Sequence, residues 1–235
     1  GSEMCIRDRY WAERKRNILL IVPAALRTQW RSELSEKFYI DSLILESSNF
    51  NKMRKEGCLN PFDAKNQVVI CSYNFAANKD SFVHAMPWDL VVLDEAHRLR
   101  NVYKPQNVTA NKLKNALKGR KKLLLTATPL QNNLMELYGL VSFIDEHVFG
   151  DAKTFREMYV AVNNAELRNR NLRDRLSVFC KRTLRKQVTE YVRYTERHAI
   201  LQEYTPTKDE ELLYNSISSY LPVSYTHLRA HETTL

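Results

Sequence analysis

Five short apolar runs constrain the fold more than any other feature of this 235-residue sequence. They occupy residues 18–22, 42–45, 68–72, 90–93 and 123–126. Because apolar side chains stand on successive positions, each run is expected to form a strand that is buried on both faces. Strands of that kind are typical of parallel sheets.

Helical patterns separate these runs. In three segments apolar residues recur three or four positions apart, which predicts amphipathic helices with one face on the sheet. These residues are Leu26, Trp30 and Leu34, then Ala110, Leu113 and Leu117, then Leu134, Leu137 and Val141. The alternation of strands and helices predicts an α/β fold with a doubly wound, mainly parallel sheet. Trp30 is expected to belong to the core rather than to a ligand site.

The second half of the chain differs in charge. The net charge is +9, and residues 153–197 hold twelve Lys/Arg against five Asp/Glu. A local basic excess is expected of a nucleic-acid partner, although a solvated helical surface accounts for it equally well. From about Asp151 to Tyr194 the pattern is basic helix and loop. A strand is then expected at 198–203 and a last helix from Thr207 to about Tyr220.

Composition argues against several other classes. No run reaches the roughly 20 apolar residues of a membrane span, and the first nine residues lack the apolar core of a secretion signal. The four cysteines show no CxxC spacing, which argues against a zinc site or a disulfide framework. We therefore expect a reducing compartment, cytoplasmic in a bacterium or nuclear in a eukaryote, and no membrane partner.

The two ends do not continue the patterns beside them. Residues 1–9 and 223–235 resemble translated sequencing-adapter read-through, and each tail sums to zero charge. We expect residues 10–222 to be the natural protein.

The strongest motif is WDLVVLDEAHRLRN at 88–101, where an apolar strand ends in Asp94 and Glu95. In α/β sheets ligands bind at this end of a strand. Phosphoryl transfer needs one acid to hold Mg²⁺, usually through water, and a second to orient and deprotonate the attacking water. Asp94 suits the first role and Glu95 the second. Ala96 keeps the turn compact, and His97 can sense the site from behind.

The second motif is KKLLLTATPLQNN at 121–133. Another buried strand ends in Thr126, Ala127 and Thr128, whose two hydroxyls can bond carboxylates or backbone at the same edge. Pro129 blocks extension of the strand, and Asn132 or Asn133 can cap the following helix.

Together, LDEAH and LTATPLQNN resemble motifs II and III of the Swi/Snf family of superfamily-two helicase-like ATPases. Further segments follow in that family's order: IVPAALRTQWRSEL (21–34) is similar to motif Ia, and VICSYNF (69–75) to an element that touches the DNA backbone. LYGLVSFIDEHVFGDAKTFREMY (137–159) and FCKRTLRKQV (179–188) match the run after motif III and the basic exit from the first lobe. The resemblance covers nearly all of residues 18–220. Ala127 departs from the common LTGTPLQN and leans towards bacterial branches.

The resemblance implies a RecA-like first motor lobe of an ATP-dependent translocase that moves on duplex DNA, with ATP and Mg²⁺ as cofactors. It implies catalytic roles for Asp94, Glu95 and His97, with Asp94 holding the Mg²⁺ through water. It implies coupling roles for Thr126, Ala127, Thr128 and Gln131. The implied contacts to the DNA backbone are Pro23, Ala24, Ala25, Ser72, Tyr73, Arg182, Arg185 and Lys186.

One expected element is missing from the sequence. A phosphate-binding loop reads GxxxxGK[ST], but the five glycines are followed by Ser2, Cys58, Arg120, Leu140 and Asp151. We therefore expect residues 10–150 to be a first lobe without its phosphate loop. Residues 151–203 would be a basic helical extension, and 204–222 the start of a connection to a second lobe. The chain alone is expected to be inactive.

Two alternatives stay open. The chain could come from the motor subunit of a restriction system, which also carries DEAH, although the run at 137–159 favours Swi/Snf. It could also be a non-catalytic nucleic-acid-binding module built on a helicase lobe, but the intact Asp94–Glu95 pair argues against decay. The sequence does not identify a protein partner, whether chromatin, RNA polymerase or a restriction subunit.

Overall fold

The computed structural model describes residues 16–131, 133–161, 165–181 and 204–220. The chain divides into two units, Gly1–Lys181 and Arg182–Leu235, which are described separately here. Arg182, Arg185 and Lys186, the strand expected at 198–203 and the two tails lie outside the described residues.

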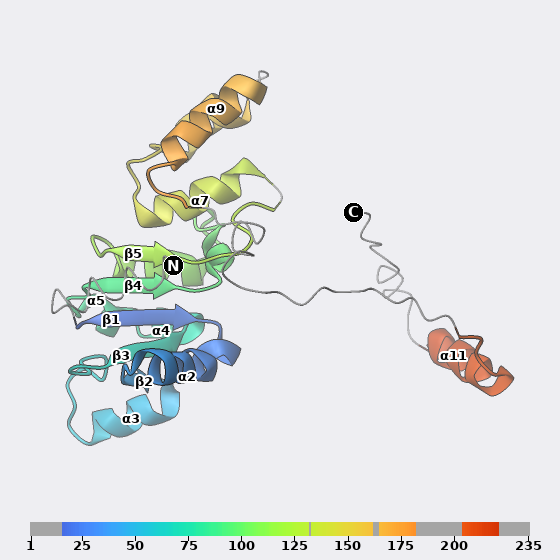
Figure 1. Ribbon diagram of the computed structural model, residues 1–235, viewed down its shortest axis with the longest axis horizontal. Coiled ribbons are helices and arrows are strands. Elements are labelled where there is room, and N and C mark those ends of the chain that lie inside the picture. Colours follow the sequence, from blue (N-terminus) through green and yellow to red (C-terminus); the bar gives the residue numbers. More distant parts are fainter. Residues whose placement is uncertain (1–15, 132, 162–164, 182–203, 221–235) are drawn as a thin grey trace. The chain divides into compact units, whose positions relative to one another are not determined.

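The first unit is built on a five-stranded sheet in which every pairing is parallel, as the sequence predicts. The strands are β1 (Ile18–Val22), β2 (Ser42–Ile44), β3 (Val68–Ser72), β4 (Leu90–Leu93) and β5 (Lys122–Leu124). Their order across the sheet is β2-β3-β1-β4-β5 (Figure 1). The chain passes from β1 to the edge strand β2, returns to β3 beside β1, and then crosses to the other side of β1 for β4 and β5. This is the doubly wound arrangement.

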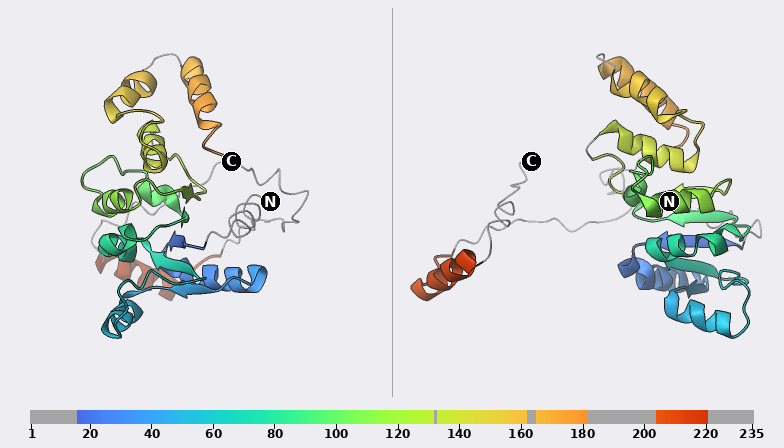
Figure 2. Two further views of the ribbon diagram at one scale, coloured as in Figure 1. Left: turned by 90° about the vertical axis from the view of Figure 1, so that its left-hand side faces the viewer. Right: turned by 180° about the vertical axis from the view of Figure 1, so that it is seen from behind.

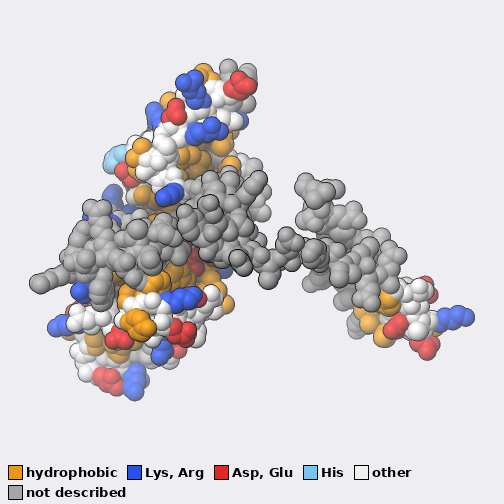
Figure 3. Space-filling model, in the orientation of Figure 1, with side chains coloured by type: hydrophobic (Ala, Val, Ile, Leu, Met, Phe, Trp, Pro, Cys, Tyr) orange, Lys and Arg blue, Asp and Glu red, His pale blue; other side chains and the backbone are white. Residues whose placement is uncertain are grey.

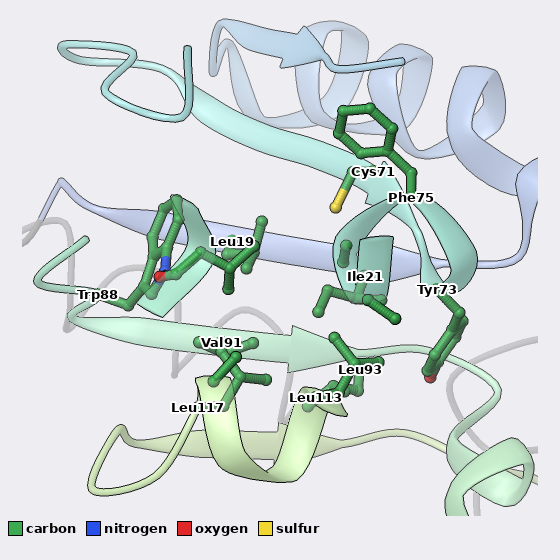
Figure 4. Packing of buried hydrophobic residues seen from close by; sticks show 14 of the residues in the cluster. Leu19, Ile21, Cys71, Tyr73, Phe75, Trp88, Val91, Leu93, Leu113 and Leu117 are labelled. Atoms are coloured by element: carbon green, nitrogen blue, oxygen red, sulfur yellow. The ribbon is translucent and has the colours of Figure 1, made fainter. Parts of the chain in front are cut away.

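Side chains of each central strand alternate between two apolar clusters. Leu19, Ile21, Val91 and Leu93 point into the larger cluster, part of which Figure 4 shows from close by. Ile18, Leu20, Val22, Leu90 and Val92 point into the smaller one on the opposite face. This explains the unbroken apolar runs, because strands covered on both faces have no side that faces water.

Helices cover both faces of the sheet (Figure 2). On the smaller cluster lies α2 (Arg27–Phe38), which follows a short 3-10 helix, η1 (Ala24–Leu26). The larger cluster includes side chains of α3 (Ser47–Lys55), α4 (Tyr73–Asn78), α5 (Asp80–His84) and α6 (Val108–Ala116). The sequence patterns found α2 and α6 but missed α3, α4 and α5, of which α4 and α5 are too short to show two turns of helical period.

Strand β5 ends earlier than the apolar run suggests, at Leu124 rather than Thr126. Leu125 still bonds to the turn after β4: its N–H donates to Leu93 and its carbonyl accepts from Ala96, both at 2.9 Å. Leu125 thus lies just beyond β5 but stays bonded to the end of β4 and the turn after it, and Thr126 follows.

After β5 the chain forms a helical region around a third cluster that includes Tyr138, Phe155 and Tyr159. Its helices are α7 (Leu134–Ile144), α8 (Ala152–Phe155), the π-helical turn η3 (Arg156–Val160) and α9 (Ala165–Leu176). Asn133 is the N-cap residue of α7, but its side chain makes no capping hydrogen bond. Within the described residues no helix is both long and apolar enough to cross a membrane.

In the second unit the described part holds one helix, α11 (Lys208–Tyr220). Thr207 and Glu210 form a capping box: the Thr207 N–H donates to the Glu210 carboxylate at 2.8 Å, and the Glu210 N–H donates to the Thr207 hydroxyl at 3.4 Å. This pair explains why the helix begins where the sequence predicts.

Candidate active site at the carboxyl edge of the sheet

The carboxyl ends of β1 and β4 lie side by side, because the two strands pair in parallel with Ile21 opposite Leu93. From this edge β1 leads into α2 and the β2 side of the sheet, whereas β4 leads towards β5. The winding direction of the sheet changes here, and this is where open α/β sheets bind ligands. The residues next beyond the two strands are Pro23 and Asp94.

Asp94 is fixed by contacts from four directions. Its N–H donates to the Ile21 carbonyl at 2.9 Å, and its carbonyl accepts from the Tyr73 hydroxyl at 2.7 Å. One carboxylate oxygen accepts from the Glu95 N–H at 2.9 Å, and the other accepts from the Trp30 indole N–H at 2.8 Å. The half-buried carboxylate is therefore held in one orientation.

Glu95 has a left-handed backbone, with φ 50° and ψ 45°. This conformation is uncommon for residues other than glycine and costs on the order of 1–3 kcal/mol, so it persists only where the surroundings impose it. Here the N–H of the next residue, the buried Ala96, donates to the carbonyl of Leu125, just beyond β5. The turn gives Glu95 a side chain that is 38% exposed at the edge of the sheet.

His97 lies beside Glu95, with its Nδ1 atom 3.0 Å from a Glu95 carboxylate oxygen. The approach does not have hydrogen-bond geometry, and this buried Nδ1 atom has no hydrogen-bond partner among the described residues. The structure thus brings together the three residues that the sequence predicts as catalytic.

The donor set at this edge suits Mg²⁺ held through water. The described residues contain no group of three or more His, Cys, Asp or Glu that could hold a metal ion. Mg²⁺ is usually bound by one or two carboxylates, with waters and substrate phosphates completing its octahedron. A carboxylate has about four lone-pair positions, and each Asp94 oxygen uses one in the bonds described above. Positions therefore remain for a metal-bound water.

Motif III follows β5 at the same edge, but its hydroxyls do not bond the acidic pair. The Thr126 hydroxyl accepts from the Thr128 N–H at 3.2 Å, and within the described part of the chain no hydrogen bond joins either threonine to Asp94 or Glu95. The backbones of the two motifs are nevertheless adjacent, since the Ala96 N–H donates to the Leu125 carbonyl. Thr126 is half-buried, and Ala127 and Thr128 are exposed.

Arg100 connects the turn after β4 to motif III. Its guanidinium donates to the His97 carbonyl at 2.8 Å, to the Gln131 side chain at 2.9 Å and to Glu136 at 3.2 Å. The same Glu136 oxygen accepts from the Gln131 N–H at 2.9 Å. Glu136 is 3% exposed. Gln131, predicted as a coupling residue, is thus tied to both elements.

Close backbone packing accompanies these bonds. A Cβ atom at Gly139 of α7 would lie 1.9 Å from the Arg100 carbonyl oxygen. Only glycine allows α7 to approach Arg100 so closely.

Pro23, Ala24 and Ala25 form the exposed turn between β1 and α2. Pro23 is the N-cap residue of η1, and Ala24 and Ala25 are exposed. Arg27 folds back over this turn, donating to the Ala24 carbonyl at 3.0 Å and to the Glu46 carboxylate at 3.1 Å. A surface cavity of about 410 Å³ lies beside it, lined by Arg27, Glu46, Ser47, Ser48, Ser72 and Phe75.

Ser72 and Tyr73 differ in how accessible their side chains are to a ligand. Ser72 lines that cavity, and its hydroxyl caps α4 by accepting from the Phe75 N–H at 3.3 Å. Tyr73 is 4% exposed, and burial, followed by the nearby Asp94 charge, raises the pKa of its phenol. With its hydroxyl bonded to Asp94, Tyr73 supports the site from inside. The geometry favours its structural role over a DNA contact.

Within the described part of the basic region, α9 carries several arginines, and blue side chains are visible in that part of the space-filling view (Figure 3). It carries Arg168, Arg170, Arg173 and Arg175 against Glu166 and Asp174. Arg170 and Arg173 are exposed.

Sequence reasoning missed three contacts of this site: the bond from Trp30 to Asp94, the Arg27 side chain over the β1 turn, and the Arg100–Glu136 pair. Trp30 was assigned to the core. It does pack against the smaller cluster, but its indole N–H reaches the carboxylate. Arg27 stands one turn after Pro23, and that spacing was an available signal.

The sheet order and flanking helices define an α/β domain of the RecA-like class. Two solved structures share this fold: the Sulfolobus solfataricus SWI2/SNF2 ATPase core in complex with dsDNA, with a TM-score of 0.62 and 19% identity, and that ATPase core domain alone, with 0.60 and 17%. The first match covers 75% of this chain and 36% of that structure's chain, and the second covers 81% and 38%.

The chain belongs to the SNF2-related domain family, whose sequence model matches residues 4–233. It is 30% identical over 205 residues to the uncharacterized ATP-dependent helicase YqhH of Bacillus subtilis, covering 86% of this chain and 34% of that protein. It is 36% identical over 148 residues to the DNA repair and recombination protein RAD54 of Oryza sativa, covering 61% and 15%. The chain thus spans about a third or less of these relatives.

Proposed function

We propose that this chain is part of the first motor lobe of an ATP-dependent translocase that moves on duplex DNA. The observation that carries the proposal is the Asp94–Glu95 pair at the carboxyl end of β4, beside the end of β1, in a chain of the SNF2-related domain family. The names of its relatives as ATP-dependent helicases support ATP as the nucleotide.

Within that motor the acidic pair divides two tasks. Asp94, held by the Trp30 and Glu95 N–H groups, would accept a hydrogen bond from a water bound to Mg²⁺, and the ion would neutralise phosphate charge in the transition state. Glu95 orients the attacking water and takes its proton. Two elements would respond to whether nucleotide occupies this edge of the sheet. One is His97, which lies next to Glu95. The other is motif III, which Arg100 ties to the turn after β4.

The proposed division of the chain follows from this role. Residues 10–150 form the RecA-like lobe without its phosphate loop, 151–203 its basic helical extension, and 204–222 the start of a connection to a second lobe. Because a triphosphate needs a cradle of backbone amides and a lysine, the chain by itself does not provide a complete ATP site: it contains no Gly-Lys pair.

We therefore expect the full-length protein, but not the 235-residue chain, to release phosphate from ATP with duplex DNA as activator. A phosphate-release assay with and without DNA measures both. Steady turnover by the chain alone, abolished by Glu95→Gln, would reveal a phosphate site elsewhere in it. A full-length protein that binds DNA without hydrolysing ATP would favour the non-catalytic module.

The proposed DNA path uses backbone contacts at the β1 turn and on the basic extension. Exposed Ala24 and Ala25 begin a helical segment, and the N–H groups at such a terminus favour anions. Arg27 adds a guanidinium beside them, although it is shared with Glu46. The remaining proposed contacts are Pro23, Ser72, Arg182, Arg185 and Lys186.

The basic extension leads to a prediction of salt-dependent DNA binding. If the chain neutralises about four phosphates, its affinity for duplex DNA falls by about 10²-fold between 50 and 200 mM salt, whatever the sequence. Fluorescence anisotropy with a labelled duplex measures the slope. Changing exposed Arg170 and Arg173 of α9 to Gln should lower the slope by about two.

The matched control changes two exposed lysines at α6, Lys112→Gln and Lys118→Gln, which remove the same charge from another face. Equal losses of slope from both pairs would mean that only net charge matters. A salt-independent affinity would exclude phosphate contacts as the source of binding.

A further inference from the structure

We propose that Trp30 is a positioning residue for the metal-holding carboxylate, and that it links that carboxylate to the helix that follows the proposed DNA-contacting turn. The inference rests on the proposed function of Asp94. It concerns a residue whose type and spacing suggest only a place in the core.

The first observation is the bond itself. The Trp30 indole N–H donates to one Asp94 carboxylate oxygen at 2.8 Å, across 64 positions of sequence. An indole has one N–H donor and no acceptor, and buried tryptophans usually satisfy that donor. Here the acceptor is an ionisable side chain at the candidate metal site rather than a backbone carbonyl.

The second observation is what else holds that carboxylate. Among the described residues, its other oxygen accepts only the N–H of the adjacent Glu95, a contact that belongs to the same turn. Backbone bonds to Ile21 and Tyr73 fix where Asp94 lies but leave its side-chain torsions free. Among the described residues, Trp30 is the side chain that fixes how the carboxylate is turned, and so where its remaining lone pairs point.

The third observation is the position of the ring. Trp30 lies on α2 and packs between this helix and the smaller apolar cluster. The helix follows directly on η1, which begins at the exposed Ala24. The indole ring packs against the sheet, and its N–H donates to the Asp94 carboxylate. A shift of α2 would therefore be transmitted to Asp94. A DNA phosphate at the β1 turn would thus act on the orientation of the metal-holding group.

The bond can be tested in the chain as it stands by NMR of its three tryptophan indole groups. Trp30→Phe identifies the Trp30 indole signal by its loss. In an Asp94→Ala variant that signal should shift and its proton should exchange with water at least about tenfold faster, as expected when a donor loses a charged acceptor. The Trp88 signal should stay unchanged.

The functional test uses the full-length protein with Trp30→Phe, which keeps an apolar ring and removes the donor. Loss of a group that orients a metal ligand typically costs about 10–100-fold in metal affinity or activity. We expect the Mg²⁺ concentration for half-maximal ATP hydrolysis to rise by about tenfold, and the stimulation by DNA to fall, with little change in the thermal midpoint.

Trp88→Phe is the matched control. Trp88 is 4% exposed and donates to the Val83 carbonyl at the same 2.8 Å, but it lies before β4, at the other end of the strand. Its Mg²⁺ dependence should match the unaltered protein. If Trp30→Phe unfolds, replacing Trp30 by the isosteric benzothienylalanine removes the N–H without changing the ring's shape.

The outcomes separate the two proposals. Glu95→Gln tests the proposed function, because an active Glu95→Gln protein would overturn the roles of the acidic pair whatever Trp30 does. If Glu95→Gln is inactive while Trp30→Phe and Trp88→Phe share a normal Mg²⁺ dependence, the function stands and the positioning role of Trp30 is wrong. An unshifted Trp30 indole signal in Asp94→Ala would overturn the bond itself.

Discussion

Glu95→Gln in the full-length protein should lower the rate of DNA-stimulated ATP hydrolysis by about 10²–10⁴-fold, the usual contribution of a positioned general base. Glutamine keeps the size of the side chain and can still accept a hydrogen bond, but it cannot take a proton from the attacking water. Nucleotide binding should persist, because the change leaves Asp94 and its two N–H donors in place.

The measurement pairs steady-state phosphate release with equilibrium binding of a fluorescent nucleotide. Glu56→Gln is a suitable control, since it also removes an exposed carboxylate, but one paired with Lys52 at the end of α3. It should retain most of the hydrolysis rate. A Glu95→Gln protein that binds nucleotide poorly yet hydrolyses it would show that the roles of the two acids are assigned wrongly.

The sheet could be predicted from the sequence because its signal is local. The runs that form the central strands, such as Leu90–Leu93, are buried in the structure as expected, whereas the edge strands β2 and β5 are only partly buried. An apolar run does not show where strand pairing stops: the run continues to Thr126, whereas β5 ends at Leu124. The end of β5 was therefore predicted two residues too late.

The candidate site was predicted in its residues but not in its contacts. Asp94 and Glu95 are next to each other and follow a strand, so the sequence alone brings them together. The partner of Asp94 is 64 positions away, and the pairing depends on how α2 crosses the sheet. Trp30 belongs both to the core and to the site. The spacing of apolar residues along a helix identifies only the first of these roles.

The same reasoning applies to the buried pair of Arg100 and Glu136. A glutamate in α7 reads as a surface residue, because charged side chains are seldom fully buried. Its burial follows from the close approach of α7 to Arg100, which Gly139 permits. The sequence pattern of a single helix cannot show that α7 comes this close to Arg100.

Glu136→Ala should lower the free energy of unfolding by about 3–5 kcal/mol, the usual loss when one partner of a buried ion pair is removed. The Arg100 side chain is only 12% exposed, so its charge cannot regain water without moving the turn after β4. The Gln131 N–H would lose its acceptor as well. Urea denaturation of the chain, followed by circular dichroism, gives the difference.

Two further variants decide what the pair contributes. Glu146→Ala removes a glutamate from an exposed pair with Lys114, at 3.5 Å and 48% exposure, and should cost less than about 1 kcal/mol. Arg100→Met with Glu136→Leu removes both charges, and it should recover most of the stability lost in Glu136→Ala, since no buried charge is left unpaired.

In the full-length protein this double variant should still couple DNA binding to ATP hydrolysis poorly, because Gln131 is no longer tied to the turn that carries Glu95. A Glu136→Ala chain as stable as Glu146→Ala would mean that the contact between α7 and the β4 turn rests on apolar packing alone.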